Sequence, residues 1–436
     1  IALDSLLSET QVFVDQVLEQ FSQDGCWKLE ELEHGLRNAL LKDGCRILQT
    51  LLNQPRALGK HVPAGRLHDV RTRRVQSLLG PFELTRGYYE QGTRRWYPMD
   101  DLLGLNESYT PGLLRLMCHS AATDGSFREA EETLRVYSGV HTPSSQIRQA
   151  VLRVAPELAQ WREQRGSPRL VSPRATVYIS ADGTGVPMRL HETRGRRGKQ
   201  PDGSSRTREV KVGSVFESLG CDEKGQPLRE PSSTTYLASF HAAEDFGLKL
   251  RTEALGRGIG HAKRQVFIGD GARWVWKMAG ANFPDAIQIL DFYHACEHLQ
   301  TLATALYPKQ PEKIQEAFRQ WRSTMDKNGI HKVIGEAQEK MPHHGPRRKT
   351  VEKEIAYFET NSKRMTYRTF RKQGLFIGSG VVEAACKTVV GKRTKQSGMF
   401  WTVHGAQRLL DIRCAVMDGT FEEYWQHRNA HTRLAS

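Results

Sequence analysis

Hydrophobic residues recur at two spacings along the chain, and the spacing changes at defined points. Over residues 1–58 they recur every three or four positions, which is the period of an amphipathic helix. The two series are Val14, Val17, Leu18 and Phe21, and Leu29, Leu32, Leu36 and Leu40. We therefore expect core-facing helices over residues 1–58. Helical spacing returns over residues 110–160, so that segment is also predicted to be helical.

Residues 70–98 have a different character. Val75, Leu78 and Leu79 lead to Gly80-Pro81, which is a turn signal, and β-forming residues follow from Phe82 to Tyr89. This pattern predicts a β-hairpin that turns at Gly80-Pro81.

Strand-forming runs dominate from residue 174 onward. The runs cover residues 175–180, 210–215, 234–240, 265–269 and 286–290. A helical pattern over 241–258 separates the third run from the fourth. Three strands, a helix, a strand, a helix and a further strand make an α/β order.

Strand character ends after residue 291. Residues 292–372 predict three or four charged amphipathic helices with breaks at Pro308, Gly329 and 342–346. A new helix is then expected from the Gly378-Ser379-Gly380 turn. Between the first two strands, residues 191–208 are rich in Gly, Arg, Lys and Ser, which predicts a mobile basic loop.

A Gly-bearing turn at Gly139 separates two helical patterns, and Thr142-Pro143 precedes the second. This arrangement is typical of a helix-turn-helix, in which Arg148 and Arg153 would contact DNA. An ordinary pair of antiparallel helices is the alternative, because such patterns are also common by chance.

Composition favours a soluble protein with a polyanionic partner. The 436 residues suggest roughly two or three domains. A net charge of +14 favours nucleic acid, although a protein can be basic without such a partner. The seven cysteines are scattered and form no CxxC pair, which argues against disulfides or a zinc ribbon and fits a reducing cytoplasm. We see no signal peptide and no apolar run of the ~18 residues that span a membrane.

Acidic residues follow two of the predicted strands. Asp182 and Asp270 each come after a strand and precede a glycine, and Glu383 lies on the late helix. A lone Asp-Gly is most often a simple turn. Two at strand ends of one α/β unit can instead converge with a third carboxylate on divalent cations, which assist phosphodiester chemistry. We expect these three residues to hold Mg²⁺, with Mn²⁺ as a substitute.

Basic residues follow Glu383 closely. Lys387 lies four residues further, on the same helical face, and Lys392, Arg393 and Lys395 come next. If the helix runs through Val390, these last three lie just beyond its end. We expect Lys387, Arg393 and Lys395 to bind DNA phosphates; the alternative is a solvated basic helix end.

Several motifs together resemble one known family. They are Ser180 to Pro187, Gly269 to Ala272 with Trp274, Asp291 to Leu299, Gly378 to Lys387, and Arg393 to Trp401. Residues 175–415 resemble the catalytic region of DDE transposases from prokaryotic insertion sequences of the Kra type, which are relatives of the Lre-type and Mutator-like families. The resemblance implies an RNase H-like core, a mixed five-stranded sheet flanked by helices, with an all-α insertion. A mainly helical N-terminal DNA-binding region would precede this core.

The resemblance also implies roles for individual residues. Asp182, Asp270 and Glu383 would form the catalytic triad and bind the metal. Asp291 and His294 match an auxiliary element after the fifth strand and would orient a phosphate, a base or a carboxylate; a helix cap and a polar-face histidine are the alternative. A zinc site is not expected at His294 and His298, because no cysteine lies at ligand spacing.

These expectations divide the chain and define its function. The segments are a helical region at 1–69, a hairpin and helix-turn-helix-like DNA-binding region at 70–165, the core at 174–291, the insertion at 292–372, the last core helix at 373–415 and a C-terminal tail at 416–436. We expect metal-dependent cleavage and strand transfer at mobile-element ends, with end and target DNA as partners, in a nucleoid-associated homo-oligomer. The alternatives are an RNase H-like structure-specific nuclease and a domesticated, non-catalytic DNA-binding protein. No P-loop motif is present, so ATP use is not expected.

Overall fold

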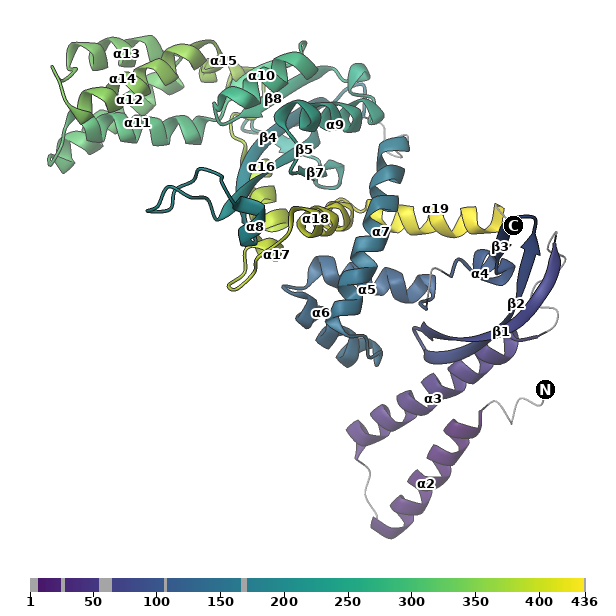
Figure 1. Ribbon diagram of the computed structural model, residues 1–436. Helices are drawn as coiled ribbons and strands as arrows, with labels where there is room; N and C mark the ends of the chain where they lie inside the picture. The colour runs from purple at the N-terminus through teal and green to yellow at the C-terminus, as the bar shows by residue number, and fades with distance from the viewer. Residues whose placement is uncertain (1–6, 25–27, 55–64, 106–107, 166–170, 435–436) are drawn as a thin grey trace. The chain divides into compact units, whose positions relative to one another are not determined.

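The computed structural model describes residues 7–24, 28–54, 65–105, 108–165 and 171–434 (Figure 1). The chain forms two compact units. One unit contains Ile1–Val154 and Gly419–Ser436, and the other contains Ala155–Asp418. None of the helices in the described part combines the length and apolar character needed to cross a membrane.

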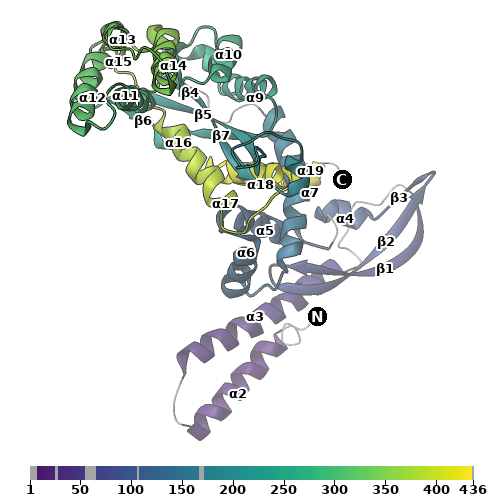
Figure 2. The same ribbon diagram turned by 60° about the vertical axis from the view of Figure 1, so that its left-hand side comes forward.

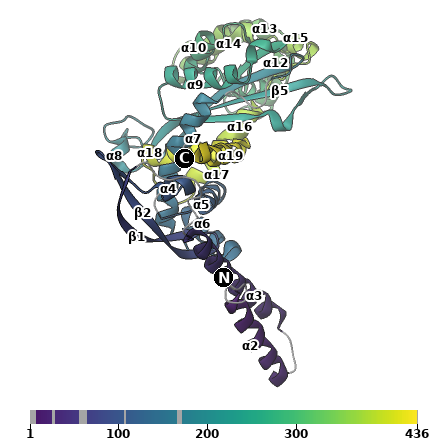
Figure 3. The ribbon, with the colours of Figure 1, turned by 90° about the vertical axis from the view of Figure 1, so that its right-hand side faces the viewer.

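The first unit begins with a pair of helices, α2 (Ser8–Asp24) and α3 (Leu29–Leu52), which lie side by side (Figure 3). Asp43 of α3 is 1% exposed, and its carboxylate accepts hydrogen bonds from the backbone N–H groups of Glu9 (3.0 Å) and Thr10 (2.8 Å). These bonds satisfy donors that the first turn of α2 leaves open. The helices predicted for this region are confirmed over these ranges. The expectation that they face a core is wrong, because most of the apolar residues on which it rested are exposed, among them Val14, Leu18, Leu29, Leu36 and Leu40.

The predicted hairpin is also present. Strands β1 (Arg66–Ser77) and β2 (Gly80–Gln91) pair antiparallel, and β3 (Arg94–Trp96) adds to the end of β2. The turn is two residues earlier than predicted, because Ser77 pairs with Gly80 and its hydroxyl binds the backbone of Gly80 and Leu79. Gly80 and Pro81 therefore belong to β2.

Helices complete the first unit. They are α4 (Pro98–Leu103), α5 (Pro111–Thr123), α6 (Phe127–Thr133), the π-helical turn η1 (Leu134–Ser138), the N-terminal part of α7 (Ser144–Gln164) and α19 (Thr420–Leu434). A C-terminal tail was expected at 416–436. That expectation is wrong for most of this range, because Thr420–Leu434 form the packed helix α19. Phe421, Tyr424 and Trp425 recur at helical spacing and are at most 2% exposed. Phe421 packs on His119 of α5, with the ring centroids 5.9 Å apart.

The second unit is built on one mixed sheet. Its strands are β4 (Thr176–Pro187), β5 (Thr207–Cys221), β6 (Pro227–Arg229), β7 (Thr235–Ser239), β8 (Arg264–Gly269) and β9 (Ile287–Leu290). The order is β6-β5-β4-β8-β9, and β7 also pairs with β5. Strand β5 is antiparallel to β4, whereas β8 and β9 run parallel to it. The five predicted strands are confirmed, and the short β6 was not predicted.

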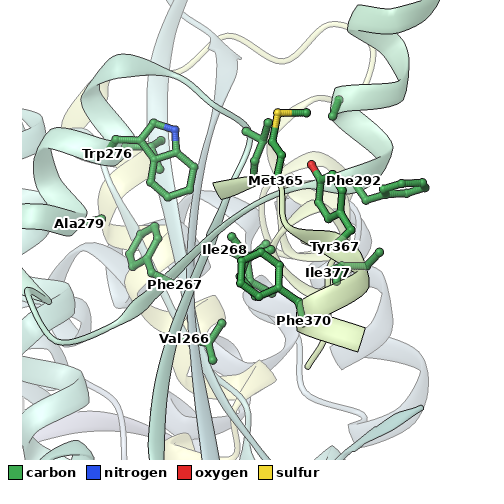
Figure 4. Close-up of a cluster of buried hydrophobic side chains, with 14 of the residues drawn as sticks. Val266, Phe267, Ile268, Trp276, Ala279, Phe292, Met365, Tyr367, Phe370 and Ile377 are labelled. Atoms are coloured by element: carbon green, nitrogen blue, oxygen red, sulfur yellow. The ribbon is translucent and has the colours of Figure 1, made fainter. Parts of the chain in front are cut away.

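Helices cover both faces of this sheet (Figure 2). A Cβ atom on Gly213 of β5 would meet Leu250 of α9 (Ala243–Gly256), which packs beside α10 (Arg273–Asn282). The neighbouring Val212 points to the opposite face, where it packs with Val382 and with Leu410 of α18 (Val403–Met417). The parallel strand β8 is buried at four consecutive residues, 266–269, so it is covered on both faces, which explains its continuous apolar run. Figure 4 shows Val266, Phe267 and Ile268 of β8 within this core.

The predicted helical segment after β9 is confirmed. It contains α11 (Phe292–Leu306), α12 (Pro311–Asp326), α13 (Ile330–Glu339), α14 (Pro346–Asn361), η4 (Ser362–Arg364) and α15 (Tyr367–Lys372). The late helix begins as predicted, with α16 (Gly380–Ala385). It continues without a break as the π-helix η5 (Cys386–Gly391) and then as α17 (Lys392–Thr394).

Candidate functional site

Three aspartates lie level with one another at the carboxyl edge of the parallel strands. Ser180 of β4 pairs with Ile268 of β8, so two residues further along Asp182 is level with Asp270. Gly269 pairs with Leu290 of β9, so Asp270 is level with Asp291. This edge of an open α/β sheet is where ligands generally bind. The expectation that β4 ends at Asp182 is wrong, because pairing with β5 carries β4 on to Pro187.

The carboxylate of Asp182 is held in a partly buried position. Its Oδ1 accepts a hydrogen bond from the Gly183 N–H (2.6 Å), and its Oδ2 accepts one from the Cys386 thiol (3.3 Å). Burial raises the pKa of Asp182; the negative charge of Asp270 raises this pKa further, and His294 lowers it. Asp182, Asp270 and His294 are therefore close enough to interact electrostatically.

The turn that carries Asp270 is fixed from α14. The Tyr357 hydroxyl donates a hydrogen bond to the Asp270 carbonyl oxygen (2.9 Å), and Asp270 Oδ1 accepts one from the Ala272 N–H (3.0 Å). Gly271 has a φ of +96°, and a Cβ there would lie 2.6 Å from the Tyr357 ring. Glycine is required at this position both by backbone conformation and by space.

Asp291 is fully buried, and both of its carboxylate oxygens are engaged. Oδ1 accepts a hydrogen bond from the His294 N–H (2.7 Å), which makes Asp291 the N-cap of α11. Oδ2 accepts a hydrogen bond from the Ser379 N–H. Asp291 therefore connects the start of α11 to the turn before α16. In this structure it acts as a helix cap, which was the alternative to an auxiliary catalytic role, and it also makes a tertiary contact.

His294 lies in the first turn of α11 with its side chain 36% exposed. Its Nδ1 is 3.2 Å from a carboxylate oxygen of Glu297, and its ring lies 5.0 Å from that of His298. The His298 ring in turn stacks on Tyr357, with the centroids 3.7 Å apart. A chain of ring contacts thus connects His294 to the residue that holds the Asp270 turn.

Glu383 does not join the two aspartates. Its carboxylate accepts a hydrogen bond from the Ser379 hydroxyl (3.2 Å) and lines a separate cavity of about 540 Å³. Across the described residues, no three His, Cys, Asp or Glu side chains are gathered closely enough to hold a metal ion. Burial raises the pKa of the Cys386 thiol, and the charges of Asp182 and Glu383 raise it further.

The oxygen donors of Asp182 and Asp270 fit a divalent cation, since Mg²⁺ prefers carboxylate ligands. A cation would also offset the burial and repulsion that raise the pKa of Asp182. Glu383 would have to turn away from its cavity to complete such a site. The π-helix begins three residues after it, and such segments occur frequently at functional sites.

The basic residues after Glu383 occupy three different environments. Lys387 is exposed. The Lys395 ammonium donates a hydrogen bond to the Thr184 hydroxyl, and burial lowers the Lys395 pKa while Asp182 acts to raise it. Arg393 is 1% exposed, with its guanidinium 5.5 Å from the centre of the Trp401 ring, so it lies within the fold in this conformation.

The expected helix end is also in a different place. Helical backbone continues from Gly380 through Thr394, so Lys392 and Arg393 lie inside the helix rather than beyond it. Lys395 alone follows its last residue.

The helix-turn-helix candidate is a compact helical corner. Gly139 adopts a φ of +72° after η1, and α7 follows. The Glu131 carboxylate of α6 accepts a hydrogen bond from the Ser144 N–H (2.9 Å), which fixes the start of α7. Arg148 is exposed on α7, whereas Arg153 is half-buried.

Exposed arginines on the hairpin form a further basic surface, which we call the basic arm. It consists of Arg66, Arg71, Arg74, Arg94 and Arg95. Its guanidinium groups alternate with aromatic rings: Arg71 lies 4.7 Å from the centre of the Tyr88 ring, and Arg94 lies 4.7 Å from the Trp96 ring. The sequence predicted this hairpin but not the stacking of its arginines on aromatic rings, because that stacking depends on how the strands pair.

Together these features define a mixed α/β protein with an acidic edge on its parallel strands and a helical segment between the last strand and the late helix. Residues 23–429 match the uncharacterised protein family UPF0236, and the chain belongs to that family. It is also similar to a Streptococcus gallolyticus protein described as "UPF0236 protein in vanSb 3'region". The two are 23% identical over 370 residues, which cover 82% of this chain and 75% of the relative.

Proposed function

We propose that this protein is a DDE transposase, which cleaves DNA at the ends of a mobile element and joins them to a target. One observation carries the proposal: strand register brings Asp182 and Asp270 level at the carboxyl edge of adjacent parallel strands. Glu383 lies on a helix that packs against the same sheet. This is the set of residues that the sequence resemblance implies.

The fold supports an RNase H-like core. Three strands joined in antiparallel fashion are followed by two parallel strands, each preceded by a helix, and helices cover both faces. A helical segment follows the last strand and precedes the helix of Glu383. This order agrees with the mixed sheet and all-α insertion that the resemblance implies, apart from the short additional strand β6.

In this proposal Asp182 and Asp270 hold divalent cations, and Glu383 completes the ligand set. When bound, such ions neutralise charge on the attacking and leaving oxygens of a phosphodiester. The protein's own residues orient the carboxylates: Gly183 and Cys386 fix Asp182, as described above. Lys395 lies near Asp182 and adds positive charge for the DNA backbone.

DNA would be bound largely through phosphate contacts. The net charge of +14 and the basic arm supply cations, and aromatic rings hold two of these cations, Arg71 and Arg94, in place. A two-stranded β-ribbon also fits the major groove of duplex DNA. The exposed Arg148 of α7 is a second candidate contact.

The test uses purified full-length protein and linear DNA that carries both ends of the element in which its gene lies. With Mg²⁺ or Mn²⁺, we expect cleavage at the ends and joined products. Asp270→Asn should abolish both and leave DNA binding largely unchanged, because it removes a charge and keeps the shape. Cleavage without joining would favour the nuclease alternative, and binding without cleavage would favour a non-catalytic DNA-binding protein.

A further inference from the structure

The cavity beside Glu383 has the size and lining of a ligand site. Its volume of about 540 Å³ lies in the ordinary range for small-molecule pockets. It is lined by residues of β6, of the start of α11 and of α16, together with Arg371 and residues 375–378. All of its walls belong to the second unit.

One wall of the cavity is aromatic. Phe216 stacks on Tyr178 with the ring centroids 5.0 Å apart, and Phe376 lies edge-on to both rings. Tyr293 stands at the same cavity and is 64% exposed. A Cβ atom on Gly378 would lie 2.9 Å from the Tyr293 ring, so the ring packs closely against the glycine backbone. This contact holds the Tyr293 ring while most of the side chain stays exposed.

The polar side chains of the lining include two cations and one anion. Arg229 of β6 and Arg371 of α15 contribute two guanidinium groups, Gln226 contributes an amide, and Glu383 contributes one carboxylate. Arg371 is oriented by Asp326, whose carboxylate lies 3.2 Å from its Nε. Such guanidinium groups recognise phosphate well.

We propose that this cavity receives a single unpaired nucleotide of the bound DNA, with its base on Tyr293 and a phosphate at Arg229 and Arg371. The proposal rests on the proposed function, and it adds a subsite for the DNA substrate. Aromatic rings stack on any base, and the Gln226 amide can pair with a base edge. Because Glu383 lines the same cavity, the nucleotide held there is a near neighbour of the phosphate to be cut.

A nucleotide of the DNA is favoured over a free nucleotide. The chain contains no P-loop that would cradle a polyphosphate. Arg229 and Arg371 come from separate elements, β6 and α15. Two separate guanidinium groups can contact the phosphates on both sides of one nucleotide of a DNA strand. The shared chemistry is a base with its phosphate, and the experiment distinguishes the two sources.

The test measures binding of the full-length protein, without divalent metal, to two DNA duplexes. One carries a single unpaired 2-aminopurine, and the other carries the same base fully paired. We expect about tenfold tighter binding of the bulged duplex, as one base-aromatic stack provides, with quenched 2-aminopurine fluorescence. Tyr293→Ala should remove both the preference and the quenching, while Tyr293→Phe should keep them. Tyr137→Ala, at a 78% exposed tyrosine of the other unit, is the matched control and should keep the preference.

Three outcomes would overturn the proposal. They are equal binding of both duplexes by the wild type, an unchanged preference in Tyr293→Ala, and Tyr293-dependent binding of free dAMP with no preference for the bulge. Arg229→Ala is a second variant at an exposed side chain and should weaken bulge binding selectively. A protein that prefers the bulge but never cleaves DNA contradicts the proposed function alone, and cleavage without any bulge preference contradicts the cavity alone.

Discussion

Substitutions of Asp291 distinguish a residue that positions the backbone from one that binds metal. Asp291→Ala removes the N-cap of α11 and the acceptor for the buried Ser379 N–H. A cap contributes about 1 kcal/mol, and a hydrogen bond to a charged group about 1.5–3 kcal/mol, so the variant should lose about 2.5–4 kcal/mol of stability. Asp291→Asn should also be costly, because its amide can accept only one of the two bonds while its NH₂ group faces the other donor.

The protein has two units, so one unfolding curve does not report on this site alone. Hydrogen exchange of the amides of His294 and Ser379 measures the local effect directly. We expect both to exchange much faster in Asp291→Ala, with cleavage lowered because the turn before α16 loosens. Asp285→Ala, at an exposed carboxylate near β9, should change stability by less than about 0.5 kcal/mol. Unchanged exchange together with abolished cleavage would refute the positioning role and make Asp291 a catalytic residue.

Three further outcomes test other parts of the proposal. Asp182→Asn should abolish cleavage yet raise the melting temperature at neutral pH. Because the folded-state pKa of Asp182 is raised, its protonated carboxyl group contributes to stability at acid pH, and this contribution is lost as the pH rises through that pKa. Equal melting temperatures of this variant and the wild type at neutral pH would contradict this reasoning. Arg66→Ala should reduce the slope of log affinity against log salt by about 0.9, whereas Lys42→Ala on α3 should leave it unchanged. Arg393→Ala should lower the melting temperature more than DNA affinity, because this side chain is buried against Trp401; the reverse order would show that it contacts DNA.

The sequence predicted the strands and helices well because their apolar residues recur at clear spacings. It could not predict where β4 ends, since the extension beyond Asp182 depends on pairing with β5. The C-terminal helix was missed because few apolar residues mark it, although Phe421, Tyr424 and Trp425 share one helical face.

The candidate site was predicted as a set of residue types, and its geometry was not. Asp182 and Asp270 become neighbours through strand register, which local patterns do not specify. Asp291 was expected to orient a phosphate, a base or a carboxylate, yet hydrogen bonds from the His294 and Ser379 backbone engage both of its oxygens. Arg393 resembled its exposed neighbour Lys387 in sequence. Its burial comes from packing against Trp401, which no local pattern specifies.

The helical segment after β9 has a structural consequence for the acidic edge. Its first helix is capped by Asp291, which also binds the turn before α16. Its helix α14 supplies Tyr357, which holds the Asp270 carbonyl and packs against Gly271. Both contacts fix backbone at the ends of β8 and β9, where the carboxylates lie. Removing the segment would leave the Asp270 turn without the Tyr357 hydroxyl that binds its carbonyl. It would also remove α11, the helix that Asp291 caps. We therefore infer that the acidic edge and the helical segment form one functional structure.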